Sequence, residues 1–402
     1  MPKYASLVNR TANEGSAAWH ILFQAWKDKA AGENVIILAV GDPDFNTPQA
    51  IIDSAKQAMD AGETHYIDIP GLPALREAVA GELMRVSGAS AEDYRIGPDN
   101  VMICQGTQNA LFAASLCLLE EGDEIIALEP MYLTYQSTFE VNGAKLVRVS
   151  CPRETGFRPQ PDLIEQAVTA NTRAILFANP NNPTGAVFTP DELEAIADIA
   201  RRHDLWVIAD EVYAGQVYDG KHHSIAALPG MAERTVTCGS LSKALAMTGW
   251  RVGWVAGPEE FIHHAHHAGI VMHYGVSAFI QHASVTALRD CRKDVEEMRD
   301  AYHRRCNIVL DKLSGAPGLH PIAPEGAMYV LLDVTGTGYS SAEFAQQLYA
   351  NEKVAVLDAK PFGPSADGCV RIAFTISDDD IAEACDRIYR FAASRHNERK
   401  AS

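Results

Sequence analysis

The central part of the chain alternates short apolar runs with longer segments of helical periodicity. The runs between residues 101 and 256 are rich in Val, Ile and Leu and carry few polar positions. Strands that are buried on both faces have this character. Helical patterns such as Gln108–Leu119 and Pro190–His203 separate them, which favours a mainly parallel sheet covered by helices on both sides. The runs are Val101–Cys104, Glu124–Leu128, Lys145–Val149, Ala174–Ala178, Trp206–Ala209, Thr235–Cys238 and Val252–Ala256.

The pattern changes after residue 262. A long helical stretch over Phe279–Leu313 ends at a Pro- and Gly-rich break, and three apolar runs follow. These runs predict strands near Met328–Asp333, Val354–Leu357 and Val370–Phe374, and thus a smaller α+β unit. The first 47 residues are too few for a domain, so we expect them to pack against that unit. We predict an N-terminal arm that is part of the small domain (1–47), a large domain (48–285) and a C-terminal small domain (286–402).

Composition and charge exclude several classes of protein. Of 402 residues, 47% are hydrophobic, and the formal charge is -18. Binding to nucleic acid or to an anionic membrane would have to overcome this negative field. We find no apolar stretch of membrane-spanning length, no secretory h-region and no C-x-x-C pair among the eight cysteines. These features predict a cytoplasmic protein with reduced thiols.

The segment after the run Thr235–Cys238 holds three groups that suit one ligand. Lys243 lies at the strand exit, with Ser240 before it and Arg251 eight residues after it. An isolated lysine there is usually a solvated charge, but near positive charge and away from water it becomes a reactive amine. Arg251 and the hydroxyl of Ser240 suit a phosphate group. A reactive lysine beside phosphate ligands points to pyridoxal phosphate as the cofactor.

Three other strand exits offer groups to the same ligand. Asp210 ends an apolar run, where ligands of open α/β sheets bind, and its carboxylate suits a protonated pyridine nitrogen. The turn Asn179–Gly185 offers an amide to a phenolate oxygen, a task that Tyr213 can share. Backbone N–H groups of Gln105–Gln108, with the Thr107 hydroxyl, form a phosphate cradle where a helix begins. Taken singly, each feature is also a common N-cap or turn.

In order and spacing, these segments resemble the class I/II aminotransferases of fold type I, which depend on pyridoxal phosphate. The similarity covers nearly the whole chain. It implies an α/β fold in which a large domain with a mainly parallel seven-stranded sheet is joined by a smaller α+β domain. It also implies ping-pong transfer of an α-amino group from an L-amino acid to a 2-oxo acid. The motifs are Gly41–Phe45, Asn179–Gly185, Asp210–Tyr213, Ser240–Lys243 and Arg251.

The resemblance assigns a role to each candidate residue at the cofactor. Lys243 matches the residue that bonds to the cofactor and moves the substrate proton, and Asp210 matches the partner of the pyridine nitrogen. Asn182 and Tyr213 are expected at the ring oxygen, and Tyr132 is expected to stack on the ring. The residues expected around the phosphate are Gly106, Thr107, Gln108, Ser240 and Arg251.

Three further residues are matched to the substrate and to a second subunit. Arg371 corresponds to the arginine that clamps the substrate α-carboxylate, with Gly41 and Asn182 close to the same group. Tyr66 corresponds to a tyrosine that reaches the phosphate of the neighbouring subunit. The resemblance therefore implies a homodimer with shared active sites.

Several segments resemble arginine–pyruvate transaminases in particular. Arginine is accordingly the leading hypothesis for the amino donor, and pyruvate for the acceptor. A guanidinium group calls for a carboxylate in the site, and Glu14 is our hypothesis for it. The segments are Ser16–Trp19, Thr64–Tyr66, Glu129–Tyr135, Leu228–Ala232, Ala246–Trp254 and Phe362–Ala366.

Other functions stay open at this point. The same residues suit aminotransferases with aspartate, aromatic or other donors, and carbon–sulfur lyases of the same fold. An effector-sensing module of a transcription regulator would need a DNA-binding domain, for which the residues before Gly41 leave little room. A non-catalytic relative is disfavoured by intact Lys243, Asp210 and Arg371. His263 and His267 form one face of a helix, but no flanking carboxylate or cysteine completes a set, so we expect no metal.

Overall fold

The apolar runs of the central region form one seven-stranded sheet in a computed structural model, which describes residues 3–11, 19–89 and 94–401. The strand order is β2-β8-β7-β6-β5-β3-β4. Neighbouring strands run parallel, except that β8 is antiparallel to both β2 and β7. The predicted fold class, an α/β fold with a mainly parallel seven-stranded sheet, is confirmed. The strands are β2 (Val101–Cys104), β3 (Glu124–Glu129), β4 (Lys145–Ser150), β5 (Thr172–Ala178), β6 (Trp206–Asp210), β7 (Thr235–Ser240) and β8 (Gly253–Ala256).

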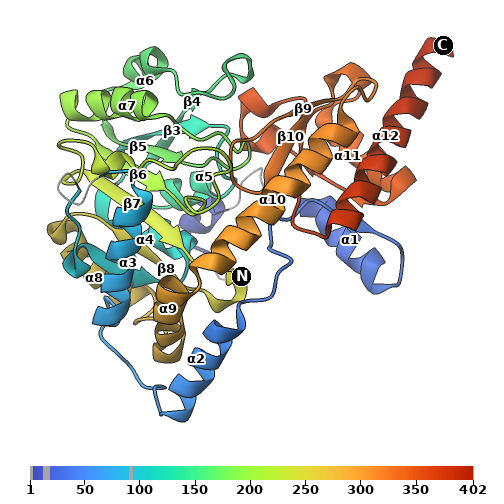
Figure 1. The fold of residues 1–402 in the computed structure, drawn as a ribbon. Coiled ribbons are helices and arrows are strands. Elements are labelled where there is room, and N and C mark those ends of the chain that lie inside the picture. The colour runs from blue at the N-terminus through green and yellow to red at the C-terminus, as the bar shows by residue number, and fades with distance from the viewer. Residues whose placement is uncertain (1–2, 12–18, 90–93, 402) are drawn as a thin grey trace.

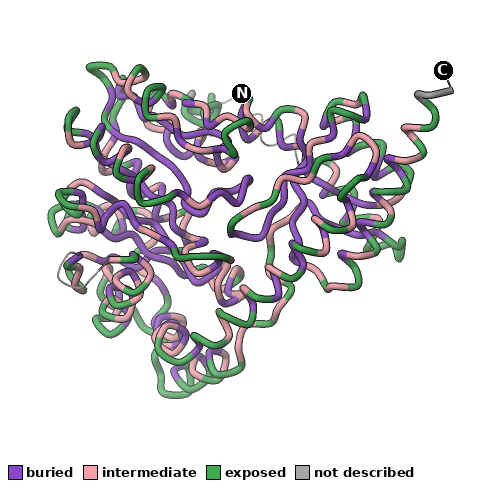
Figure 2. Tube along the Cα trace, turned by 45° about the horizontal axis from the view of Figure 1, so that its top comes forward, coloured by how far each residue is buried: buried purple, intermediate pink, exposed green. Residues whose placement is uncertain are grey.

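Helices cover both faces of this sheet, which explains the long apolar runs in its inner strands (Figures 1 and 2). On one face lie α4 (Thr107–Leu118), α5 (Tyr135–Glu140) and α8 (Glu259–Met272). On the other lie α3 (Pro73–Val86), α6 (Pro161–Ala167), α7 (Pro190–Arg202) and α9 (Ala278–Asp290), and α2 (Gln49–Asp60) packs on α9.

Local sequence signals determine where some of these helices begin. The hydroxyl of Thr189 accepts a hydrogen bond from the N–H of Glu192, whose carboxylate accepts one from the N–H of Thr189. This capping box starts α7, and Ser340 and Glu343 form another before α11 (Ser341–Glu352). Each box satisfies backbone N–H groups that the helix itself leaves without partners.

The C-terminal part of the chain builds a second, antiparallel sheet of order β12-β13-β10-β9. The long helix α10 (Arg292–Leu313) runs toward it from the large sheet, and α11 and α12 (Asp378–Ala401) pack beside it (Figure 1). The strands are β9 (His320–Ile322), β10 (Tyr329–Asp333), β12 (Leu357–Asp358) and β13 (Cys369–Ala373).

Two elements differ from the predictions. The single helical stretch expected over Phe279–Leu313 is two helices, because the backbone at Cys291 leaves helical geometry (φ -104°, ψ 28°). The single strand expected over Val354–Leu357 is β11 (Val354–Ala355) and β12, which pair with different strands. Neither segment contains Gly or Pro, so no local signal in the sequence marks either break.

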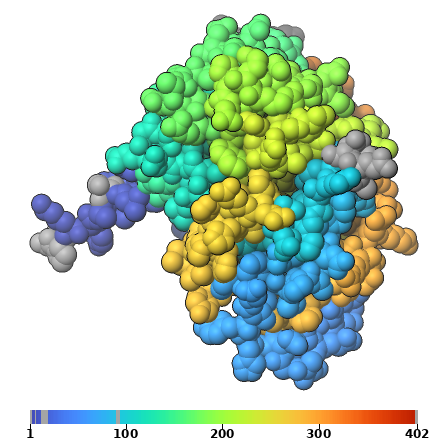
Figure 3. Space-filling view, turned by 90° about the vertical axis from the view of Figure 1, so that its left-hand side faces the viewer, coloured from blue at the N-terminus to red at the C-terminus, as the bar shows by residue number. Residues whose placement is uncertain are grey.

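The N-terminal region lies against the C-terminal part. Strand β1 (Ile36–Ile37) pairs in parallel with β11, and helix α1 (His20–Ala30) lies near α11 and β11. The hydroxyl of Tyr349 on α11 donates a 2.5 Å hydrogen bond to Asp28 on α1. The dark-blue N-terminal end of the chain projects from the body of the molecule (Figure 3).

All eight cysteines are unpaired, and seven of them are buried. Among the described helices, none combines the length and apolarity that a bilayer crossing needs. The described residues also contain no group of three His, Cys, Asp or Glu side chains placed to hold a metal ion. The rings of His263 and His267 instead contact each other, with centroids 4.9 Å apart.

Candidate active site

The carboxyl ends of β5 and β6 and the exit of β7 open into one cavity of about 250 Å³. The carboxyl ends of neighbouring parallel strands meet at one edge of a sheet, so side chains from distant parts of the chain converge there. The predicted site residues that line it are Gly41, Thr107, Gln108, Tyr132, Asn182, Asp210, Tyr213, Ser240, Lys243, Arg251 and Arg371.

Two predicted residues do not line this cavity. Gly106 is the N-cap of α4 and lies against the guanidinium of Arg251. Tyr66 is 84% exposed and packs edge-on against Tyr274, with ring centroids 5.0 Å apart. Tyr66 is therefore outside the cavity of its own chain, and its role toward a second subunit stays a prediction. Glu14, the hypothetical guanidinium ligand, lies outside the described residues.

Lys243 is held by a carbonyl from a distant segment. Its Nζ donates a 2.6 Å hydrogen bond to the backbone oxygen of Gly41. A Cβ on Gly41 would lie 1.9 Å from the hydroxyl of Tyr329, so only glycine lets the backbone come this close. The amine thus points into the cavity from the β7 side and meets the N-terminal segment there.

Asp210 is a buried carboxyl group at the end of β6. Its Oδ2 accepts a 2.7 Å hydrogen bond from Tyr135, and its Oδ1 accepts a 3.2 Å bond from the N–H of Val212. Burial raises the pKa of Asp210 to about 6, although the two hydrogen bonds oppose that shift. A carboxyl group with this pKa can share a proton with a ring nitrogen near neutral pH.

The start of α4 has the properties of a phosphate site. Gly106 adopts a positive φ of 82°, and the hydroxyl of the following Thr107 is buried without a hydrogen-bond partner. The guanidinium of Arg251 lies alongside and donates a 2.8 Å hydrogen bond to the carbonyl of Thr248. An unpartnered hydroxyl, free helix N–H groups and a guanidinium together fit an oxyanion such as phosphate.

The side chain of Gln108 is bonded within the protein, so the group that it can offer to an anion is its backbone N–H. The side-chain amide donates to the Thr138 hydroxyl and accepts from the Thr134 hydroxyl, each at 2.7 Å. Both groups of the amide are therefore used within the protein. The N–H of Gln108, in the first turn of α4, remains available to an anion.

Arg371 brings a cation from the small antiparallel sheet to the same cavity. It is only 2% exposed, and it donates 2.9 Å hydrogen bonds to Oδ1 of Asn182 and to the carbonyl of Ala39. Its guanidinium carbon lies 4.3 Å from the ring centroid of Tyr329. Its Nε is buried without a partner. A buried guanidinium that no carboxylate neutralises can bind a substrate anion.

The turn that carries Asn182 is held from within. Oδ1 of Asn181 accepts hydrogen bonds from the N–H and the hydroxyl of Thr184, at 3.2 and 2.9 Å. The turn therefore presents the side chain of Asn182 to Arg371 in a fixed direction.

The structure adds lining residues that the sequence interpretation missed: Trp19, Tyr135, Thr248 and Tyr329. The hydroxyls of Tyr329 and Tyr213 are 2.8 Å apart, and burial raises the pKa of Tyr213 well above its ordinary value. The Tyr213 phenol therefore keeps its proton. Tyr135 and Trp19 belong to segments that the resemblance had indicated, whereas Tyr329 stands in an ordinary strand with no motif around it.

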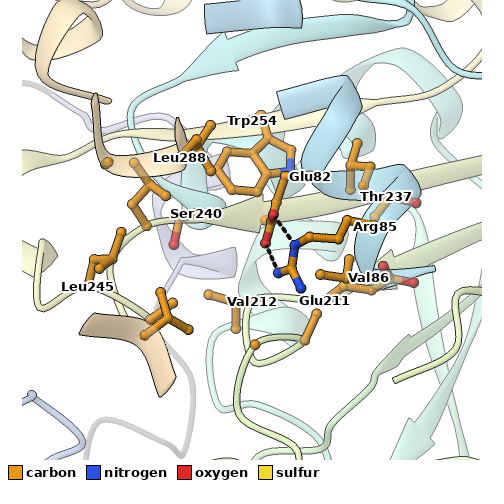
Figure 4. A pocket seen from close by; sticks show the side chains of 18 of the residues that line it. Glu82, Arg85, Val86, Glu211, Val212, Thr237, Ser240, Leu245, Trp254 and Leu288 are labelled. Atoms are coloured by element: carbon orange, nitrogen blue, oxygen red, sulfur yellow. Dashed lines mark hydrogen bonds and ion pairs between the residues drawn. The ribbon is translucent and has the colours of Figure 1, made fainter. Parts of the chain in front are cut away.

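A second cavity of about 60 Å³ lies on the α3 and α9 side of β7 (Figure 4). The ion pair between Glu82 and Arg85 lies at this cavity, and the indole of Trp254 is part of its lining (Figure 4). Of the predicted site residues, it shares only Ser240 with the larger cavity. The predicted site residues therefore gather at the 250 Å³ cavity and not at this one.

The sequence from residue 33 to residue 388 matches the family profile described as aminotransferase class I and II. The chain belongs to this family. Arginine–pyruvate transaminase AruH of Pseudomonas aeruginosa is 43% identical over 391 residues, which cover 97% of this chain and 98% of that protein. Aromatic-amino-acid aminotransferase 2 of Thermococcus litoralis is 40% identical over 365 residues, 90% of this chain and 92% of that protein.

The fold agrees with solved structures of this family. An aspartate aminotransferase of Thermus thermophilus, a single mutant, superposes with a TM-score of 0.90 at 32% identity and covers 97% of this chain and 100% of that one. The protein is therefore an aminotransferase, and pyridoxal phosphate is the cofactor of its family. The unpartnered Thr107 hydroxyl, Arg251 and the buried Asp210 fit that cofactor's phosphate and ring nitrogen.

Replacing Gly106 by alanine should weaken cofactor binding, because the new Cβ would lie 2.5 Å from Nη2 of Arg251. Gly122→Ala is the matched control: its φ is also positive, but nothing lies within 4 Å of its Cβ position. We expect the dissociation constant to rise about tenfold or more in G106A alone, a change of ~1.4 kcal/mol. Titration of the cofactor-free variants measures it, and equal weakening in both would contradict a cradle at Gly106.

Asp210 makes the stability of the cofactor-free chain depend on pH. Because its folded pKa is raised to about 6, the stability from the neutral carboxyl is present below about pH 4 and is lost as the pH rises through about 6. The side chain of the Asp210→Asn variant stays neutral at every pH. The melting temperature of this variant minus that of wild type should therefore increase from about pH 4 to about pH 8. Calorimetry of both cofactor-free proteins measures this difference, and a constant difference would refute the raised pKa.

Proposed function

We propose that this protein is a cytoplasmic aminotransferase that transfers the α-amino group of L-arginine to pyruvate. The observation that carries the proposal is the 43% identity to an arginine–pyruvate transaminase across 97% of the chain. Relatives named for aspartate and aromatic amino acids are 34–40% identical, so the charges in the cavity must also be considered.

Each lysine and arginine that lines the cavity has a proposed role, so none is free to bind the side-chain carboxylate of an acidic donor. Lys243, Arg251 and Arg371 are the lysines and arginines that line it among the described residues. We assign Lys243 to the cofactor, Arg251 to the phosphate and Arg371 to the α-carboxylate of the substrate. A donor such as aspartate carries a second carboxylate, which would then have no cation of this chain to bind.

The rest of the lining includes aromatic side chains, which suit a cationic side chain of the donor. The half-buried Trp19 and Tyr132 line the cavity, whereas the one lining carboxylate among the described residues is Asp210. Asp210 is fully used by its hydrogen bonds and by the ring nitrogen that we assign to it. A guanidinium can bind to the face of an indole, so we assign Trp19 to the donor's side chain.

In the reaction, Arg371 and Asn182 hold the α-carboxylate and orient the donor so that its Cα–H faces Lys243 Nζ. Bound pyridoxal phosphate supplies an electron-accepting ring that makes this hydrogen acidic. Once the donor's amino group has replaced it at the cofactor, the free amine of Lys243 would take the proton from Cα and hold it for return during the transfer. Asp210 keeps the ring nitrogen protonated, while Asn182 and the phenol of Tyr213 donate hydrogen bonds to the ring oxygen. Arg251, Ser240 and the N-terminus of α4 hold the phosphate.

We further propose a homodimer in which Tyr66 reaches the phosphate of the second subunit. Two groups of exposed apolar side chains support a second copy. One is the N-terminal end with Tyr4, Leu7 and Val8, and the other is Tyr66 with Val271 and Tyr274. Apolar residues that gather at the surface in this way are typical of protein interfaces.

A panel of amino donors tests the proposed reaction. L-Arginine should remove the absorbance of the lysine-bound cofactor, and pyruvate should restore it with formation of alanine. Lys243→Ala should lose both signals and keep the fold. A response confined to aspartate or aromatic amino acids would contradict arginine as donor. Release of pyruvate and ammonia without an acceptor would instead indicate a carbon–sulfur lyase.

The role of Trp19 is tested by a pair of leucine variants. Trp19→Leu should lower kcat/KM for arginine by about tenfold and leave kcat/KM for alanine nearly unchanged. Only arginine has a cationic side chain that can bind to the indole face. Trp26→Leu is the control, since Trp26 lies on α1 outside the cavity and is 48% exposed. Equal losses for arginine and alanine in W19L would show that Trp19 does not bind the donor's side chain.

A further inference from the structure

Residues 38–47, which we call the strap, contact both parts of the molecule at the active site. The strap contains the motif Gly41–Phe45, whose acidic residues have no role in the chemistry above. On one side it meets the loops that carry Lys243, and on the other it meets the small antiparallel sheet. Its position therefore decides how these two parts approach each other.

The contacts to the large domain surround Lys243. The carbonyl of Gly41 accepts the hydrogen bond of the lysine amine, and Asp42 accepts a 2.7 Å hydrogen bond from the hydroxyl of Thr248. The hydroxyl of Thr47 donates a 2.7 Å hydrogen bond to the carbonyl of Ala246 and accepts one from the indole N–H of Trp250.

The contacts to the small domain surround Arg371. The carbonyl of Ala39 accepts a hydrogen bond from the guanidinium of Arg371. Next to it, the carbonyls of Leu38 and Val40 accept hydrogen bonds from the N–H of Ala373 and the hydroxyl of Thr375, at 2.8 and 3.1 Å. The strap thus fixes groups beside both ends of the bound donor, the reacting amine and the carboxylate clamp.

Arg305 anchors the strap through Asp44. Its two terminal nitrogens donate to the two oxygens of Asp44 at 2.7 and 2.9 Å, and its Nε donates to Asp378 at 3.0 Å. Arg305 is 5% exposed, and its guanidinium lies 5.1 Å from the ring centroid of Phe45. A bidentate pair with a buried arginine constrains geometry far more than an exposed ion pair does.

We infer that Arg305 and Asp44 are positioning residues that hold the strap over Lys243 and Arg371 for the reaction. Arg305 lies on α10 and Asp378 at the start of α12, so the anchor belongs to the small domain. The inference rests on the proposed roles of Lys243 and Arg371, and it does not depend on arginine as the donor. Because the strap acts at the amino-acid end that all donors share, its loosening should affect every donor in the same proportion.

Asp44→Asn tests the anchor in the cofactor-loaded enzyme. The carboxylate is partly exposed, so the variant should fold, but it loses the charge that pairs with Arg305. We expect KM for arginine and for alanine to rise by a common factor of about tenfold, with kcat changed much less. Asp44→Glu, which keeps the carboxylate, should recover most of the loss.

The matched control is Asp386→Asn. Asp386 on α12 pairs with Lys312 on α10 at 2.6 Å, so it joins the same two helices without touching the strap. Hydrogen exchange of the cofactor-free proteins gives a second readout. The N–H of Leu38 donates a hydrogen bond to the carbonyl of Ala355, and the N–H of Ala373 donates one to the carbonyl of Leu38. Both amides should exchange faster in D44N than in D386N.

Equal KM values and equal exchange in D44N and D386N would overturn the inference and leave the pair a structural contact only. A loss confined to one donor would also overturn it. If wild type does not use arginine but D44N shows the common loss with the donors it does use, the donor proposal fails and the anchor stands.

Discussion

The buried guanidinium of Arg371 is the interaction on which the rest of the site depends. This charge lies on β13 of the small sheet, yet its partners are a side chain after β5, a carbonyl of the strap and the face of Tyr329. A buried cation is costly unless other groups compensate it, and none of these partners is a carboxylate. The arrangement therefore links the small sheet to the strap and to the turn after β5, and it leaves the charge of Arg371 without a carboxylate partner among the described residues.

Two further polar groups at the same cavity are costly to bury. The hydroxyl of Thr107 has no partner, and the carboxyl of Asp210 is buried beside a second acidic residue. We expect each of these groups to lower the stability of the cofactor-free chain near neutral pH, and we propose that Thr107 meets the phosphate of pyridoxal phosphate and Asp210 its ring nitrogen. Buried polar atoms without a partner occur at several places in the described residues, and those of Thr107 and Arg371 line this cavity. An unpartnered buried polar atom at a cavity is a candidate for contact with a ligand.

The sequence predicts the large sheet well because its strands are buried on both faces and leave continuous apolar runs. It also indicates Lys243, Asp210, Asn182 and Arg251, since each follows directly after a strand or within a recognisable turn. The break at Cys291 leaves no Gly or Pro signal, and Trp19 and Tyr329 reach the cavity only through tertiary packing. The anchor between Asp44 and Arg305 joins residues 261 positions apart, so no local pattern reveals it. Tyr66 is 84% exposed and lies outside the cavity of its own chain, whereas its motif gives no sign of this position.

The central claim is that Lys243 is the amine that binds the cofactor in this cavity. The most direct measurement is to reduce the cofactor-loaded enzyme with borohydride, digest it and locate the added cofactor mass by mass spectrometry. The account predicts one modified lysine, in the peptide that contains Lys243. Modification of another lysine, or of none, would contradict it.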